Sequence, residues 1–144
     1  MDYQNLLSEL ISISPGQIIA IDGPAGSGKT TLAKKLKLDI SEVEIIHLDD
    51  LYHGWSDAFS PRLTASIINQ ILIPISNGNE FVFDIYDWRS NKFSKSKIIP
   101  AGKIYILEGV SAGQRQFRKY LSKILWLNIA DKEGCLLYTS DAAD

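Results

Sequence analysis

The chain has 144 residues, of which 45% are hydrophobic and 22% are charged, and its formal net charge is −2. This length suits one compact domain rather than two. The near-neutral charge does not favour nucleic acid as a partner, and no apolar run reaches the length of about 18 residues that a membrane span needs. We therefore expect neither nucleic acid nor a membrane among its partners.

The N-terminal segment 2–12 carries Leu6, Leu7 and Leu10 at helical spacing. It predicts a short helix that ends at the Ser-Pro-Gly stretch 14–16. The segment is acidic and amphipathic, whereas a signal peptide is basic and then apolar. We therefore expect a cytoplasmic location.

Five apolar runs of strand length follow this helix. They are rich in Ile, Val, Leu and aromatic residues, as strands buried on both faces are, and they span 17–21, 43–48, 81–87, 103–108 and 123–129. Helices are predicted over 28–39, 61–76 and 113–122, with Pro74 shortening the second. Residues 89–102 are predicted as a loop with at most a short strand at 97–99. The alternation predicts an α/β fold, a parallel sheet of about five strands flanked by helices.

The stretch IDGPAGSGKT, residues 21–30, matches the pattern G-x-x-x-x-G-K-[ST] between a predicted strand and a predicted helix. Its glycines let backbone amides face phosphate oxygens, and the start of the helix adds unpaired N–H groups. The predicted nucleotide-binding residues are Gly23, Ala25, Gly26, Ser27, Gly28, Lys29, Thr30 and Thr31. Lys29 is expected to reach the β- and γ-phosphates of ATP, and the Thr30 hydroxyl to ligate Mg²⁺. A glycine-rich turn that matches by accident is the alternative.

Acidic residues follow two of the predicted strands. Asp49 and Asp50, in HLDDLYHGW (47–55), lie at the carboxyl end of a strand, where ligands bind in open parallel sheets. Either carboxylate could accept the proton of an alcohol during phosphoryl transfer, or it could cap the next turn. Glu108 ends a later strand and either belongs to a magnesium site or is satisfied by backbone groups.

Two further features do not support a site. His47 and His53 have no further His or Cys at ligand spacing, so they are interpreted as ordinary strand-edge and loop residues. The stretch NKFS at 91–94 lacks the acidic residue of a guanine-binding Asn-Lys-x-Asp element. Guanine specificity is therefore not expected.

Four motifs occur in an order and at intervals that resemble those of the uridine kinase family of P-loop kinases. They are GPAGSGKT (23–30), DDLY (49–52), IYDW (85–88) and LEGV (107–110). The resemblance covers most of residues 17–130, although only the first motif is specific by itself. It implies a P-loop NTPase fold and transfer of the γ-phosphate of ATP to a hydroxyl of a small-molecule acceptor, a nucleoside such as uridine or cytidine in the first place.

The resemblance also implies roles for individual residues. It makes Asp49 the general base and, with Lys29, a catalytic residue, and it adds Glu108 to Thr30 in the magnesium shell. It places Tyr52, Tyr86 and Asp87 at the acceptor site, and we predict Asp50, Trp55 and Arg89 as further substrate-binding residues.

The chain departs from the family at several positions. Leu51 and Trp88 replace the family's aromatic residues, and Trp55 either stacks on a planar acceptor or packs on its loop. The family's nucleobase-reading histidine falls near Asn91, which leaves another small alcohol open as the acceptor. The sequence is also compatible with a regulatory nucleotide-binding module that has no small acceptor, and with a non-functional gene fragment.

The last ten residues, CLLYTSDAAD, resemble the translation of a transposase adapter used in sequencing libraries. We expect a P-loop kinase-like domain over 1–134 and a non-native tail over 135–144, with a natural polar C-terminus as the alternative. Without Asp141 and Asp144 the acidic and basic residues are equal in number. The resemblance further implies an arginine-bearing lid after the fifth strand, which would be missing here, so phosphate transfer is expected to be slow.

Overall fold

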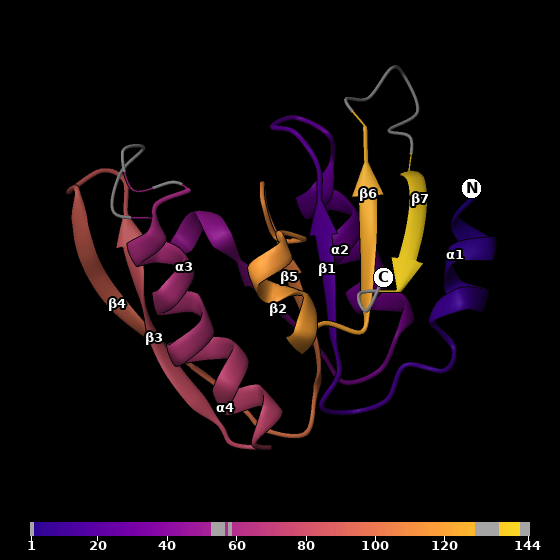
Figure 1. The fold of residues 1–144 in the computed structure, drawn as a ribbon, viewed down its shortest axis with the longest axis horizontal. Helices are drawn as coiled ribbons and strands as arrows, with labels where there is room; N and C mark the ends of the chain where they lie inside the picture. The colour runs from indigo at the N-terminus through magenta and orange to yellow at the C-terminus, as the bar shows by residue number, and fades with distance from the viewer. Residues whose placement is uncertain (1, 53–56, 58, 129–135, 142–144) are drawn as a thin grey trace.

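Helices cover both faces of a five-stranded sheet in the computed structural model of the chain (Figure 1). The structure describes residues 2–52, 57, 59–128 and 136–141. In spatial order the strands are β2 (Val43–His47), β5 (Ile104–Glu108), β1 (Ile18–Asp22), β6 (Lys123–Leu127) and β7 (Leu136–Asp141). The first four strands are parallel, and β7 pairs antiparallel with β6. The predicted α/β fold with a mostly parallel sheet of five strands is confirmed.

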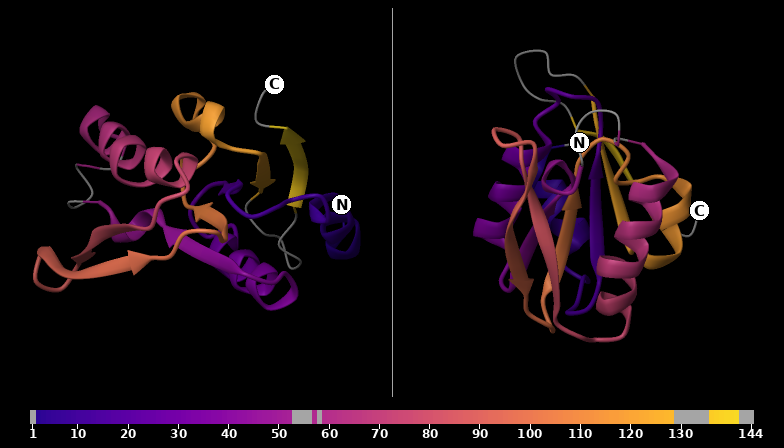
Figure 2. Two further views of the ribbon diagram at one scale, coloured as in Figure 1. Left: turned by 90° about the horizontal axis from the view of Figure 1, so that it is seen from below. Right: turned by 90° about the vertical axis from the view of Figure 1, so that its left-hand side faces the viewer.

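Side chains of the central strand alternate between two apolar clusters. Ile19 and Ile21 face the cluster beneath α1 (Tyr3–Leu10) and α2 (Lys29–Asp39). Ile18 and Ala20 face the opposite cluster, which includes residues of the helical segment 61–76 and of η4 (Arg115–Tyr120). Figure 2 shows these two helical segments on the face of the sheet opposite to α2. Because both faces of β1 are buried, its residues 18–21 are continuously apolar.

The run 81–87 does not join the main sheet, contrary to the prediction. It forms β3 (Phe81–Asp87), which pairs antiparallel with β4 (Lys92–Ile99) as a separate two-stranded sheet. The predicted loop over 89–102 is therefore also wrong for most of its length. Asn91 lies in the turn between the strands with φ +55°, a left-handed conformation that asparagine tolerates better than most residues.

The predicted helix 61–76 is present at its full length, so Pro74 does not shorten it. It consists of α3 (Pro61–Ile67), a π-helical turn η3 (Ile68–Leu72) and α4 (Ile73–Ser76). Proline cannot donate the usual backbone hydrogen bond. A wider turn directly before it accommodates that loss without ending the helix.

The predicted helix 113–122 is a short 3₁₀ helix, η4, rather than an α-helix. Both ends of this connection are tied to β1. The Gly113 amide donates to Asp22 Oδ2 at 2.9 Å, and the Ser122 amide donates to the Ile18 carbonyl at 2.8 Å. A tightly wound helix fits this constrained connection.

The C-terminal residues 136–141 lie at one edge of the sheet as β7, so part of the expected non-native tail completes the five strands. The division into a domain over 1–134 and a tail over 135–144 stays a prediction. Among the described residues, no helix has both the length and the apolar character needed to cross a membrane.

Candidate functional site

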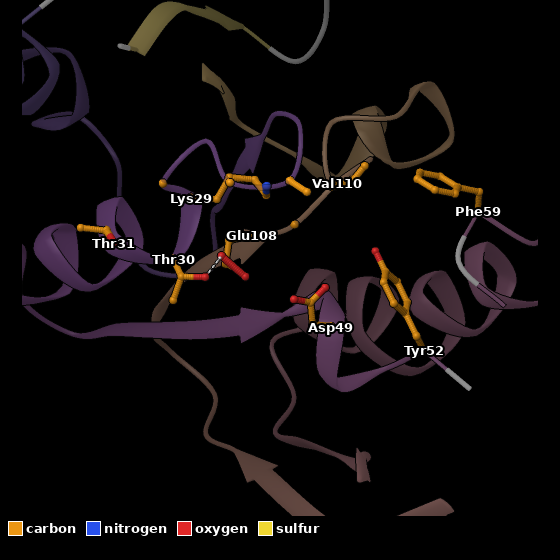
Figure 3. A pocket seen from close by; sticks show the side chains of 12 residues that line it. Lys29, Thr30, Thr31, Asp49, Tyr52, Phe59, Glu108 and Val110 are labelled. Carbon is orange, nitrogen blue, oxygen red and sulfur yellow. Dashed lines mark hydrogen bonds between the residues drawn. The ribbon is translucent and has the colours of Figure 1, made fainter. Parts of the chain in front are cut away.

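The carboxyl ends of three parallel strands meet at one edge of the sheet. There β1 leads into the glycine-rich loop 23–28, β2 into the 3₁₀ turn η1 (Leu48–Asp50), and β5 ends at Glu108. A cavity of about 280 Å³ lies between these segments (Figure 3). This is the edge where ligands of open parallel sheets bind.

The glycine-rich loop forms one wall of the cavity. Of the eight predicted nucleotide-binding residues, which lie in this loop and at the start of α2, six line the cavity: Ala25, Gly26, Gly28, Lys29, Thr30 and Thr31. Gly28 is the N-cap of α2 and has φ +93°, a left-handed conformation that glycine adopts without strain.

The remaining two predicted loop residues, Gly23 and Ser27, are not in the cavity wall. A Cβ on Gly23 would lie 2.7 Å from the Leu127 carbonyl oxygen, so the loop packs directly against β6 at this point. Ser27 is buried, and its hydroxyl has no hydrogen-bond partner among the described residues. The two residues therefore pack against the rest of the protein rather than line the cavity. Their assignment to nucleotide contact stays a prediction.

Polar side chains from three elements meet beside this wall. The Lys29 ammonium donates to the Pro24 carbonyl at 2.8 Å, across the loop. The Thr30 hydroxyl donates to Glu108 Oε2 at 2.7 Å, and His47 Nδ1 lies 3.2 Å from Glu108 Oε1. The carboxylate of Glu108 is thus held on both oxygens.

The charge state of Glu108 follows from these contacts. Burial raises its pKa, but hydrogen bonds from His47 and Thr30 outweigh burial and leave the pKa below its ordinary value. The same hydrogen bond raises the pKa of His47, although burial opposes it. Glu108 is therefore a buried but ionised carboxylate at neutral pH.

The structure distinguishes the two aspartates of η1. Asp49 is exposed and lines the cavity opposite the loop, as Figure 3 shows. Asp50 is half-buried, is not among the cavity-lining residues, and has a pKa raised by burial.

Two contacts fix the turn that carries Asp49. Leu48 is buried against Gly109, where an added Cβ would lie 2.6 Å from Leu48 Cβ. Trp88 Nε1 donates to the Asp49 carbonyl at 3.2 Å, which ties the β3–β4 hairpin to the turn. A turn of only three residues therefore has a defined place beside the cavity.

The residues predicted for the acceptor are not all brought together. Tyr52 lines the cavity, and burial together with the nearby Asp49 charge raises its pKa to about 12. Tyr86 is buried in the hairpin instead, edge-on to Trp88 and Phe93 at ring distances of 5.2 and 5.3 Å.

The rest of the acceptor assignments fall elsewhere. Asp87 accepts a hydrogen bond from the Arg89 amide at 2.9 Å at the hairpin turn, and the Arg89 side chain is exposed. Neither residue lines the cavity. Trp55 lies outside the described residues. The acceptor roles of all these residues stay predictions.

Two residues of the site, Phe59 and His47, carry no sequence signal for it. Phe59 is 65% exposed, has φ +68° and lines the cavity at the end away from the loop, near Val110 (Figure 3). His47, which the sequence indicates as an ordinary strand-edge residue, contacts the carboxylate next to the loop. No sequence motif marks these residues, because their place depends on how distant segments pack.

The donor set beside the loop fits Mg²⁺. Thr30 and Glu108 provide a hydroxyl and a carboxylate 2.7 Å apart, and oxygen ligands of this kind are those that Mg²⁺ prefers. Within the described ranges, no group of three or more His, Cys, Asp and Glu side chains could hold a metal ion.

Comparison with known proteins shows the family of the chain. The family model of the KAP family P-loop domain matches residues 2–99. The chain belongs to the KAP family of P-loop domains. No curated protein sequence matches this KAP-family chain.

Two solved structures resemble the KAP-family chain. A protein from Bacillus stearothermophilus proposed to be a uridine kinase has a TM-score of 0.74 and 19% identity, over 91% of this chain and 82% of that one. A protein from Silicibacter sp. TM1040 proposed to be a fructose transport system kinase has a TM-score of 0.65 and 16% identity, over 85% of this chain and 70% of that one. At these identities the likeness shows the fold, so the predicted P-loop NTPase fold is confirmed, while membership of the uridine kinase family stays a prediction.

Proposed function

We propose that the chain is an ATP-dependent phosphotransferase that moves the γ-phosphate of ATP to a hydroxyl of a small molecule. One observation carries this proposal: the Asp49 carboxylate lines the same cavity as Lys29 and Thr30 of the glycine-rich loop. A carboxylate facing a phosphate-binding loop is the arrangement that phosphoryl transfer to an alcohol requires.

The loop side of the cavity would bind the nucleotide. Backbone amides of the loop and the start of α2 would face the phosphates, and Lys29 would contact the β- and γ-phosphates. Thr30 and Glu108 would hold Mg²⁺, which when bound neutralises negative charge on the phosphates. The lowered pKa of Glu108 supports this role, because an ionised carboxylate is needed to ligate a cation.

Asp49 would act as the general base. Its side chain is exposed to the cavity, so it can accept the proton of an acceptor hydroxyl as the new P–O bond forms. Trp88 and Gly109 fix the backbone of the turn that carries it. A base carried on a fixed turn beside the attacking hydroxyl lowers the entropic part of the barrier.

The acceptor class that we propose is a ring-bearing alcohol, with nucleosides first. Tyr52 and Phe59 give the cavity an aromatic end away from the loop, and aromatic faces bind planar rings well. The resemblance to the uridine kinase family motifs supports the same class. Fructose is a second acceptor to test, given the proposed activity of the Silicibacter protein.

The acceptor class predicts a selective stimulation of ADP release. In the presence of Mg²⁺–ATP, uridine or cytidine should increase ADP release by this chain, while acyclic pantothenate should not, because only the nucleosides offer a planar ring to Tyr52 and Phe59. A coupled ADP assay over nucleosides, fructose and pantothenate measures this.

The remaining outcomes of this panel are equally informative. Stimulation only by fructose or pantothenate would retain the phosphotransferase and reject the planar acceptor. ADP release that no acceptor changes would favour a regulatory nucleotide-hydrolysing module. A Lys29→Ala chain serves as the control for contaminating ATPases.

A further inference from the structure

Glu108 is held from two directions by side chains of different elements. Its side chain is 3% exposed, and its two carboxylate oxygens have separate partners. Thr30 of α2 contacts Oε2 at 2.7 Å, and His47 of β2 contacts Oε1 at 3.2 Å. The plane of the carboxylate is therefore fixed by both contacts together.

The contact with His47 is built into the sheet. His47 and Glu108 are register partners at the ends of the paired parallel strands β2 and β5. An ionised carboxylate can only accept hydrogen bonds, so Nδ1 of His47 carries the proton and donates it. This contact depends on the pairing of two core strands, whereas Thr30 belongs to the helix that follows the glycine-rich loop.

We propose that His47 is a positioning residue of the magnesium site, which orients the Glu108 carboxylate toward a cation held with Thr30. This inference rests on the proposed function, because Glu108 is there assigned to Mg²⁺. Hydrogen bonds from outside the ligand shell commonly set the orientation of carboxylate and imidazole ligands, and their loss lowers metal affinity. His47 itself is not among the residues that line the cavity.

Three variants test this role by binding rather than by activity. His47→Leu removes the donor, and His47→Asn retains an amide N–H close to the place of Nδ1. Glu44→Gln changes a partly exposed side chain on the same strand and is the matched control. For each chain, isothermal titration calorimetry measures two quantities. One is the affinity for ATP in EDTA, and the other is the Mg²⁺ concentration that gives half of the magnesium-dependent gain in ATP affinity.

His47→Leu is expected to raise that Mg²⁺ concentration by about 10-fold to 100-fold and to leave ATP affinity in EDTA unchanged. His47→Asn should recover most of the loss, and Glu44→Gln should match the parent. Thermal unfolding of each variant shows whether the fold persists.

Four results would overturn the inference. One is a His47→Leu chain with the magnesium dependence of the parent. A second is a His47→Leu chain that loses ATP affinity equally with and without Mg²⁺. A third is a His47→Asn chain that needs as much Mg²⁺ as the His47→Leu chain. The second and third results would each show a structural role for the histidine. If the parent itself binds ATP equally with and without Mg²⁺, the proposed magnesium site fails, and the role of His47 fails with it.

Discussion

Lys29→Ala is expected to lower the affinity of the chain for Mg²⁺–ATP by about 30-fold or more, since truncating one partner of a hydrogen-bonded charge pair costs about 2–5 kcal/mol. Lys29 lines the cavity from the glycine-rich loop, and its ammonium contacts only a loop carbonyl, that of Pro24, among the hydrogen bonds of the described residues. It is used for charge rather than for packing. The fold should therefore persist, and calorimetric titration with Mg²⁺–ATP measures the loss.

Lys34→Ala is the matched control for this variant. Lys34 is exposed on the same helix, α2, and does not line the cavity. Its variant should bind Mg²⁺–ATP as the parent does. Equal affinities of the Lys29→Ala chain and the parent would show that the loop does not bind the triphosphate in the proposed way.

Asp49→Asn is expected to reduce acceptor-dependent turnover by about 10²-fold to 10⁴-fold, the usual contribution of a general base. Asparagine has nearly the shape of aspartate but cannot accept the proton of the acceptor hydroxyl. The hydrogen bond from Trp88 goes to the backbone carbonyl of Asp49, so the substitution leaves it in place. Affinity for Mg²⁺–ATP should change little, and steady-state kinetics with a calorimetric titration separates the two effects.

Asp50→Asn provides the comparison, since it makes the same chemical change one residue further along the same turn. Asp50 is half-buried and does not line the cavity, and burial raises its pKa. We expect a smaller loss of turnover than for Asp49→Asn. If Asp50→Asn proved the more severe of the two, the general base would be Asp50.

The glycine-rich loop could be predicted from the sequence because its structure depends on local residues. Gly28 must adopt a left-handed conformation before α2, and the Lys-Thr pair follows at fixed spacing. The position of Asp49 was also accessible, since the end of a parallel strand faces the ligand edge of the sheet. These local rules explain why the sequence could predict the loop and the carboxylate that line one cavity in the structure, while the roles of these residues stay predictions.

These rules could not predict that β3 and β4 form a hairpin outside the parallel sheet. Phe81 and Phe83 are buried while Val82 and Asp84 are exposed, which is the alternation of a strand with one solvent face, and an irregularity in the strand pairing then brings Tyr86 to a buried position. The run nevertheless resembles a buried strand in composition. Its turn contains no glycine, and the left-handed residue there is Asn91, so the usual hairpin signal is absent.

The remaining site residues depend on contacts between distant segments. His47 meets Glu108 only because β2 and β5 pair in one particular register, over 61 residues of sequence separation. Tyr86 packs against Trp88 and Phe93 because the hairpin forms, which takes it away from the cavity that the motif suggested. Motif order therefore predicted the strand ends correctly but not the direction of every side chain.

A phosphotransferase of this kind delivers phosphate to an acceptor rather than to water. Incubation of the chain with Mg²⁺, uridine and ATP labelled at the γ-phosphate, followed by separation of the products, tests this directly. We expect labelled uridine phosphate that disappears with Asp49→Asn. Label found only in inorganic phosphate, at the same rate with and without uridine, fructose or pantothenate, would contradict the proposed function.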